Sequence, residues 1–337
     1  MLVPTTFSPD KGNLQKPVAE PVFATEIFGE CRKSGKCEAM PGSKKPCEAG
    51  FRKLPKPFGS AICKKTIEAL SDMYPNIGVT TIGTSRMGRP IHALTIGNGE
   101  RAIMFNAAHH ANEWITSVLV MRFIEEYAQN CIPGITLHVI PMVNPDGVDL
   151  VTGNISPKHP AYKKAKKMTG KDTSLFPNNW KANIIGVDLN SNYPAGWQLA
   201  KQHKHKRGYT KPGPHDYVGE TPLSEPETIA MAAYTMANDF THTISLHTQG
   251  EEIYWQYQNY MPPGAENLAK RLSAASGYKL EAVPDTSSHG GYRDWFIEKW
   301  NRPGMTIECG LGTNPLPISD FNDIYKRVGP LLWEALR

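Results

Sequence analysis

Two histidines and one glutamate stand where their side chains could bind a single metal ion. His110 and Glu113 form a His-x-x-Glu motif directly after the apolar segment AIMFNAA. A short turn there brings positions i and i+3 together, and imidazole and carboxylate groups are ordinary zinc ligands. His247 ends a second apolar segment, THTISLH. Three protein ligands would leave the fourth coordination position open for water, as in a catalytic zinc centre.

Each part of this set also has a simpler interpretation. In a chain with 11 histidines, about half a His-x-x-Glu match is expected by chance. Glu113 could merely favour the positive end of a helix dipole, and His247 could be an ordinary core histidine. The polar HTQG sequence that begins at His247 favours a strand that leaves the core toward a site.

The elements that must position these residues alternate between strands and helices. Apolar spacing predicts helices within 60–75, 113–130, 224–240, 262–277, 290–300 and 320–336. Apolar runs predict strands within 80–110, 135–147, 241–249 and 305–310. This order indicates an α/β fold, with a mixed, largely parallel central sheet and helices on both faces. In such folds reactive groups gather at the carboxyl ends of strands.

Composition divides the 337 residues into two parts. Residues 1–55 are rich in Cys, Pro and Lys and lack periodicity, so we expect an irregular N-terminal extension before one catalytic domain over 56–337. Four cysteines fall early in the chain, and they could form disulfides or remain thiols: Cys31, Cys37, Cys47 and Cys63.

Charge and hydropathy exclude some classes of partner. The net charge of +5 is too small to indicate nucleic-acid binding, and no apolar run approaches the roughly 20 residues of a membrane-spanning helix. The opening residues carry no secretion signal, which favours a cytoplasmic protein. A cell-wall or spore location stays open if the sequence is part of a longer chain. No protein partner can be identified from the sequence.

Several other patterns do not lead to a function. The Gly97-Asn98-Gly99 sequence lies between two strand-like segments and favours a hairpin over a dinucleotide-binding turn. The chain contains no phosphate-binding G-x-x-x-x-G-K-[ST] motif and no G-x-S-x-G motif. His203 and His205 lie among lysines that oppose cation binding, so a surface loop is expected there.

The sequence resembles the zinc metallocarboxypeptidases over about residues 58–337. Seven motifs occur in the order of that family: AAHHANEW, VNPDG, GVDLNSNYPAGW, LSEPET, SLHTQG, GGYRDW and MTIECG. Two longer segments, HTQGEEIYW and SSHGGYRDWF, are similar to the bacterial γ-D-glutamyl-L-diamino acid endopeptidases, which cut peptidoglycan stem peptides.

The resemblance implies a role for each matched residue. It implies one Zn²⁺ per chain, bound by His110, Glu113 and His247. Asp188, in GVDLN, matches the carboxylate that orients the first histidine, and Glu308, in TIECG, matches the general acid/base. His109 lies one position off the ligand pattern and is expected to pack beside the site.

Departures from the family pattern concern substrate binding. Asn190-Ser191 stands where the family has an Asn-Arg pair that binds a free C-terminal carboxylate, and a serine cannot form that clamp. Lys181 replaces an arginine that polarises the scissile carbonyl. Thr286 replaces a mobile tyrosine, a role that His289 could partly take.

Arg293 is a further candidate for substrate binding. Its side chain could bind a second substrate carboxylate or simply lie on a helix surface.

The expected function is therefore hydrolysis of the γ-D-glutamyl–diamino acid bond of peptidoglycan stem peptides, through a zinc-activated water and Glu308. The diamino acid can be meso-diaminopimelate or lysine. A zinc carboxypeptidase of ordinary peptides is the alternative. A catalytically silent module that binds cell-wall fragments and a non-peptide acylase are more distant ones.

Overall fold

The computed structural model describes residues 57–171, 173–282 and 289–337. The predicted N-terminal extension lies outside these residues, together with Cys31, Cys37 and Cys47. Cys63 is described and is a buried free thiol. Burial raises the pKa of this thiol to about 12, so it stays protonated at neutral pH.

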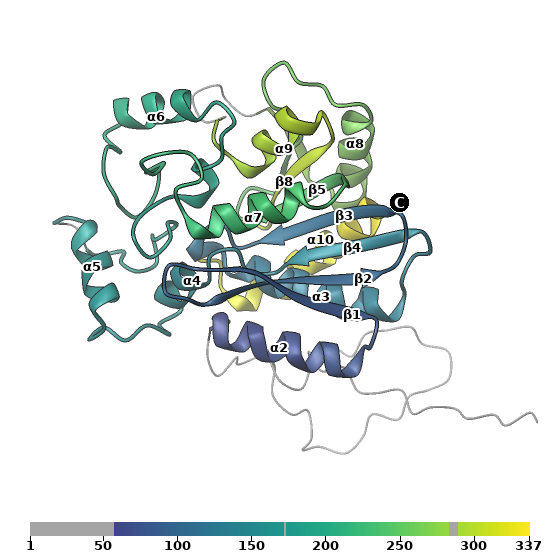
Figure 1. The fold of residues 1–337 in the computed structure, drawn as a ribbon, viewed down its shortest axis with the longest axis horizontal. Coiled ribbons are helices and arrows are strands. Elements are labelled where there is room, and N and C mark those ends of the chain that lie inside the picture. The colour runs from purple at the N-terminus through teal and green to yellow at the C-terminus, as the bar shows by residue number, and fades with distance from the viewer. Residues whose placement is uncertain (1–56, 172, 283–288) are drawn as a thin grey trace, which may run out of the picture.

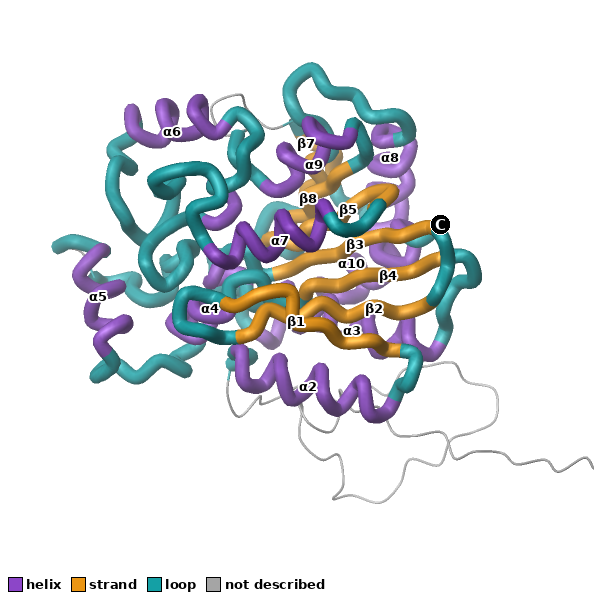
Figure 2. Tube along the Cα trace, in the orientation of Figure 1, coloured by secondary structure: helices purple, strands orange, loops and turns teal. Residues whose placement is uncertain are grey.

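One eight-stranded sheet forms the centre of the protein, in the order β1-β2-β4-β3-β5-β8-β6-β7 (Figures 1 and 2). Its strands are β1 (Ile77–Thr84), β2 (Pro90–Gly97), β3 (Arg101–Ala107), β4 (Ile135–Ile140), β5 (Phe240–His247), β6 (Glu252–Tyr254), β7 (Lys279–Glu281) and β8 (Gly304–Glu308). The central strands β4, β3, β5 and β8 are parallel, whereas β1, β2 and β6 pair antiparallel with their inner neighbours. The predicted mixed sheet with a parallel centre is confirmed.

Helices cover both faces of this sheet (Figure 1). They are α2 (Ser60–Met73), α3 (Ile115–Gln129), α4 (Pro145–Val151), α5 (Pro160–Met168), α6 (Trp197–Lys206), α7 (Pro226–Met236), α8 (Ala265–Ser276), α9 (Tyr292–Trp300) and α10 (Phe321–Ala335). α2, α3, α8 and α10 pack in one apolar cluster, and α7 and α9 pack in another on the opposite face.

Side-chain alternation along the strands divides the core between these two clusters. In β3, Ile103 and Phe105 belong to the cluster of α3 and α10, whereas Met104 belongs to the cluster of α7 and α9. Successive side chains of a strand point to opposite faces, so a sheet buried on both sides is apolar at consecutive positions. This explains the continuous apolar runs in the sequence.

The three central strands end at one edge of the sheet, where polar side chains follow. β3 ends at Ala107, β5 at His247 and β8 at Glu308. Because β5 and β8 are parallel and in register, His247 lies directly beside Glu308. Strand register alone therefore brings together two residues that are 61 positions apart in the chain.

One local prediction about a turn is wrong. The Gly97–Gly99 turn does not form a hairpin, because β4 lies between β2 and β3 in the sheet. At the start of α7 no side chain caps the helix. Glu227 is instead buried and accepts a hydrogen bond from the Arg86 backbone N–H at 3.0 Å.

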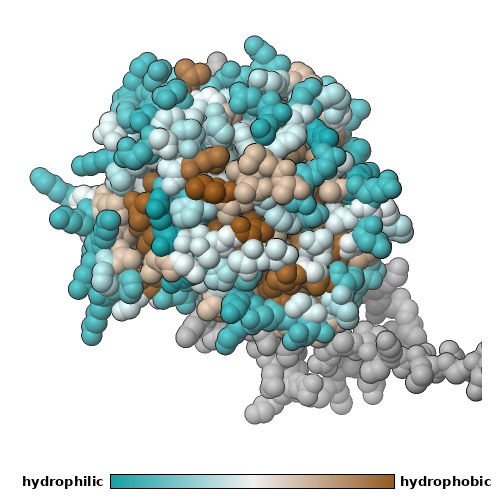
Figure 3. Space-filling view, in the orientation of Figure 1, coloured by the Kyte–Doolittle hydropathy of each residue, from teal (hydrophilic) through white to brown (hydrophobic). Residues whose placement is uncertain are grey.

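None of the helices in the described residues is both long and apolar enough to cross a lipid bilayer. On the face shown in Figure 3, apolar surface is divided into small patches between hydrophilic side chains. Scattered patches of this kind are ordinary on folded proteins.

Asn144 connects the loop after β3 to two other segments of the site. Its buried Nδ2 donates to the backbone carbonyls of His109 and Ala182, each at 3.1 Å, and its Oδ1 accepts from the Gly147 N–H at 3.0 Å. The last bond caps the start of α4. A single amide thus fixes the backbone beside His110 relative to the backbone beside Lys181.

Replacement of this amide should destabilise the protein. We expect Asn144→Ala to lower the free energy of unfolding by about 3 kcal/mol, because it leaves buried carbonyls without donors. Urea denaturation measures this change. Asn130→Ala, at the exposed end of α3 where Nδ2 bonds only the Glu126 carbonyl, is the matched control and should cost less than about 1 kcal/mol. Equal losses in both variants would contradict the role given to Asn144.

Candidate zinc site and active-site pocket

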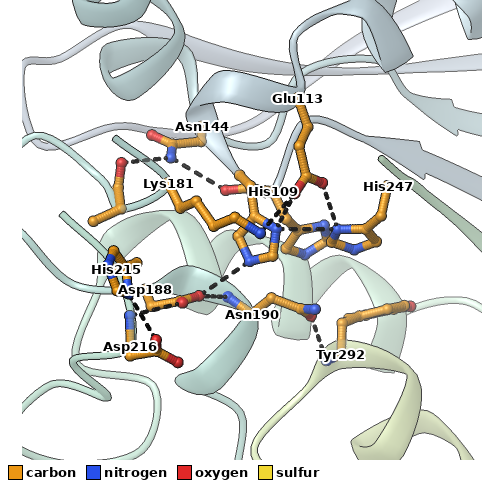
Figure 4. A network of polar contacts seen from close by, with 12 residues as sticks. His109, Glu113, Asn144, Lys181, Asp188, Asn190, His215, Asp216, His247 and Tyr292 are labelled. Carbon is orange, nitrogen blue, oxygen red and sulfur yellow. Dashed lines mark hydrogen bonds and ion pairs between the residues drawn. The ribbon is translucent and has the colours of Figure 1, made fainter. Parts of the chain in front are cut away.

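Two imidazole nitrogens and one carboxylate converge on a common point. His110 Nδ1 lies 2.9 Å from Glu113 Oε1, and His247 Nδ1 lies 2.9 Å from Glu113 Oε2. The two Nδ1 atoms are 3.2 Å apart. Figure 4 shows Glu113 from above and His247 from the right pointing toward one another, with the Lys181 side chain reaching toward the same point from the left.

These separations fit a tetrahedral zinc ion. Ligand atoms about 2.0–2.1 Å from a tetrahedral metal lie about 3.3 Å from one another. The separations in the cluster, 2.9 to 3.2 Å, are close to that value. Among the described residues, this is the one group of His, Cys, Asp or Glu side chains with ligand atoms close enough to hold an ion. The chemistry and the geometry of the donor set both fit zinc.

The local backbone explains how His110 and Glu113 meet. After β3 the chain turns through Ala108 (φ 52°), extends at His110, and enters a short 3₁₀ helix over Ala111–Glu113. That single turn carries Glu113 back beside His110. The carboxylate is held from the other side by the Thr248 N–H, which donates to Oε2 at 3.2 Å.

The electrostatics of the cluster favour a cation. Burial alone would raise the pKa of the Glu113 carboxyl, but His110 and Lys181 hold it well below its ordinary value. Burial opposes protonation of His110, yet Glu113 and Asp188 raise the pKa of its imidazole to about 9. The two carboxylates therefore favour positive charge between them, and a divalent cation satisfies that demand.

Asp188 lies on the far side of the His110 ring. Its Oδ1 is 3.2 Å from His110 Nε2, which leaves Nδ1 directed toward Glu113. Oδ1 also accepts from the Asn190 N–H and Oδ2 from the Asp216 N–H, each at 3.1 Å. Although burial opposes its ionisation, His110 lowers the pKa of Asp188. These contacts place Asp188 where a carboxylate could fix the tautomer of His110.

Glu308 faces the same centre from the end of β8. Burial, with a further contribution from Glu113, raises the pKa of Glu308 from 4.5 to about 8, whereas Lys181 opposes the rise. A carboxyl group that titrates near neutral pH can both accept and return a proton. Lys181 lies between the two carboxylates, with its Nζ 3.2 Å from Glu113 Oε1.

A pocket of about 790 Å³ opens over the cluster. It is lined by the sequence-predicted residues His110, Lys181, Asp188, Asn190, Ser191, His289, Arg293 and Glu308. Glu113 and His247 are buried below it. The structure thus brings every predicted site residue to one place, except Thr286, which lies outside the described residues.

The positions of the predicted substrate-binding residues differ in detail. Ser191 is buried, and the loop before α9 packs closely against its backbone. The approach is so close that a side chain at Gly290 would come within 2.8 Å of the Ser191 carbonyl oxygen. Asn190 Oδ1 accepts from the Tyr292 N–H at 3.1 Å, and His289 Nδ1 lies 3.1 Å from the Tyr257 hydroxyl. Arg293 is not on a helix surface, since only 7% of it is exposed.

The sequence analysis missed one wall of the pocket. The segment around His203 is helix α6 rather than a surface loop, and it brings Lys204 into the pocket beside Asp216. Trp197, Ala200 and Lys204 recur at helical spacing, and the first two are buried. That spacing was the signal that could have identified an inward-facing Lys204.

The sequence is similar to a family of known proteins. The zinc carboxypeptidase family matches residues 63–324. γ-D-Glutamyl-L-diamino acid endopeptidase 1 from Lysinibacillus sphaericus is 43% identical over 274 residues, which cover 77% of this chain and 67% of that protein. Uncharacterized protein YqgT from Bacillus subtilis (strain 168) is 37% identical, with 83% and 77% covered.

A solved structure shares the fold. Thrombin activatable fibrinolysis inhibitor superposes with a TM-score of 0.64 at 20% identity, over 82% of this chain and 73% of that one.

Zinc binding should depend on His247 and not on its neighbour His109. We expect elemental analysis to find about one zinc per chain in the unmodified protein and almost none in His247→Ala, which loses one of three ligands. His109→Gln is the control, because His109 Nε2 bonds the Tyr193 hydroxyl at 3.0 Å and its ring only packs against His247. Full zinc occupancy in His247→Ala would show that the ligand set is wrong.

Proposed function

The chain belongs to the zinc carboxypeptidase family, and we propose that it hydrolyses the γ-D-glutamyl–diamino acid bond of peptidoglycan-derived peptides. The observation that carries the proposal is the pocket itself, in which the His-Glu-His cluster faces Glu308 and the wall includes Ser191, the residue that the sequence predicts in place of the family's arginine. The relative from Lysinibacillus sphaericus, at 43% identity, is named for that reaction and supports the same assignment.

The charges of the pocket support a substrate with several carboxylates. A γ-D-glutamyl peptide keeps the free α-carboxylate of its glutamate and adds the carboxylates of the next residue. Lys181, Lys204 and Arg293 line the pocket from three different segments of the chain. Without an arginine beside Ser191, these cations are spread over the pocket instead of gripping a single C-terminal carboxylate.

His110, Glu113 and His247 are proposed to hold the zinc ion, with Asp188 fixing the tautomer of His110. When bound there, zinc lowers the pKa of a coordinated water toward about 7 and polarises the scissile carbonyl. Glu308 takes the proton of the attacking water and then delivers it to the leaving amine nitrogen, as the amide C–N bond breaks.

The remaining pocket residues are proposed to bind the substrate. The Lys181 ammonium, held by Glu113, stabilises negative charge on the carbonyl oxygen during attack. Asn190, Ser191 and His289 form the wall next to the leaving group, with positions fixed by the loop before α9.

The choice of substrate tests the proposal directly. We expect the zinc-loaded protein to cleave L-Ala-γ-D-Glu-meso-diaminopimelate between glutamate and diaminopimelate, with both products detected by mass spectrometry. Hippuryl amino acids, which are ordinary carboxypeptidase substrates, should be cleaved at least about 100-fold more slowly because no arginine binds their terminal carboxylate. The reverse preference would assign the alternative activity, that of a conventional zinc carboxypeptidase.

Turnover should require the carboxylate of Glu308. We expect Glu308→Gln to lower kcat by about 10²- to 10⁴-fold while the zinc content stays unchanged, because the amide cannot take up the proton of water. Glu252→Gln is a matched control on the neighbouring strand, since Glu252 pairs with Glu308 across β6 and β8 but bonds the Tyr254 hydroxyl. Normal turnover by Glu308→Gln would exclude its role as general acid/base.

A further inference from the structure

A buried ion pair lies in the wall of the pocket, away from the zinc cluster. Arg293 and Asp294 stand in the first turn of α9, and both line the pocket. Arg293 Nε donates to Asp294 Oδ1 at 3.0 Å, and Nη2 contacts the same oxygen. Their side chains are 8% and 5% exposed. The pair therefore presents opposite charges, side by side, to whatever enters the pocket.

Stability alone is a weak reason for this pair. Removing two charges from water costs about as much as their attraction returns, so a buried ion pair contributes little compared with an apolar pair of similar size. Asp294 Oδ2 accepts from the Gly291 N–H at 3.3 Å, a bond that an asparagine could also make. Within the described part of the chain, Arg293 Nη1 has no hydrogen-bond acceptor. Donors directed into a substrate pocket favour recognition of a ligand carboxylate.

A diamino acid whose α-carbon lies near Glu308 reaches the level of Thr306, one step along the strand from Gly304, where the stem of Arg293 packs. Gly304, Thr306 and Glu308 are every second residue of β8 and therefore lie on the same face of the strand. The stem of Arg293 packs against Gly304, where its Cγ would be 3.3 Å from an added Cβ. At about 3.3 Å per residue, Thr306 and Gly304 lie roughly 7 and 13 Å from Glu308. The distal carbon of diaminopimelate is about 5 Å from its α-carbon, to which a hydrogen bond adds about 3 Å.

Tyr254 completes this part of the pocket. Its ring lies 5.9 Å from the Arg293 guanidinium, and it also lines the pocket. A planar guanidinium held on an aromatic ring and on a carboxylate has a fixed orientation, so it loses little entropy when a carboxylate binds.

We infer that Arg293 and Asp294 bind the zwitterionic distal end of the diamino acid, so that the enzyme selects diaminopimelate over lysine. This inference rests on the proposed function. The guanidinium binds the distal carboxylate and the Asp294 carboxylate binds the distal ammonium, which closes a ring of alternating charges. A lysine residue supplies the ammonium but leaves the desolvated guanidinium without its second partner.

Three substrates separate the two contacts. They are L-Ala-γ-D-Glu peptides that end in meso-diaminopimelate, in lysine, which lacks the distal carboxylate, or in 2-aminopimelate, which lacks the distal ammonium. The zinc-loaded full chain should cleave the diaminopimelate peptide with a kcat/KM at least about tenfold above that of either analogue, because each analogue leaves one of the two buried charges without its substrate partner.

Two variants assign each contact to its residue. Arg293→Gln should lower kcat/KM by about tenfold or more for the diaminopimelate and 2-aminopimelate peptides, and much less for the lysine peptide. Asp294→Asn should lower it for the diaminopimelate and lysine peptides, and much less for 2-aminopimelate. Arg302→Gln is the matched control, because Arg302 follows α9 but pairs with Asp239 outside the pocket. It should leave all three rates unchanged.

The outcomes distinguish the inference from the proposed function. If the unmodified protein cleaves γ-D-glutamyl peptides without preferring diaminopimelate, or if each variant lowers all three rates equally, Arg293 and Asp294 are only structural and the inference is wrong. If it cleaves none of them, the proposed function is wrong. Calorimetric binding of free diaminopimelate and lysine then decides the inference separately, since equal affinities would also overturn it.

Discussion

The site depends on one buried carboxylate that two histidines share. Glu113 offers one oxygen to His110 and the other to His247, and each contact is 2.9 Å long. A carboxylate in this position cannot remain ionised in the core without positive charge around it. Lys181 and His110 supply part of that charge, and a zinc ion held by the cluster would supply the rest. The short contacts between Glu113 and the two histidines are consistent with this balance between a buried negative charge and the positive charge around it.

The parallel strands at the centre of the sheet bring these charged groups together. The residues proposed as metal ligands and as the acid/base group lie at or just after the ends of β3, β5 and β8, and parallel strands bring their carboxyl ends to the same edge. The β5–β8 register sets the distance from His247 to Glu308, and Asn144 ties the loop after β3 to the segment of Lys181. The catalytic geometry is therefore built on rigid elements, and the loops add the substrate pocket.

Charge placement around the pocket distinguishes this protein from a conventional carboxypeptidase. A single arginine beside the scissile bond would favour substrates with one nearby terminal carboxylate. In this chain Ser191 occupies that position, and cations come instead from α6, from the Lys181 segment and from α9. Each cation has its own acidic neighbour, as Lys204 has Asp216 and Arg293 has Asp294. Such pairs suit a substrate that carries both ammonium and carboxylate groups.

The sequence by itself determined the fold class, the order of the main strands and helices, and the residues His110, Glu113, His247, Asp188 and Glu308. Apolar periodicity reports burial and so predicts the elements, and His110 and His247 stand at or just after predicted strand ends. The roles of Asp188 and Glu308 came from the resemblance to the zinc metallocarboxypeptidases. Tertiary structure alone decided the rest. The Gly97–Gly99 turn looked like a hairpin because a sequence does not reveal that β4 inserts between β2 and β3. Lys204 and Asp294 became parts of the site only through the packing of α6 and α9 against the pocket. Helical spacing can indicate that a side chain faces inward, but which pocket it enters depends on contacts between distant segments of the chain.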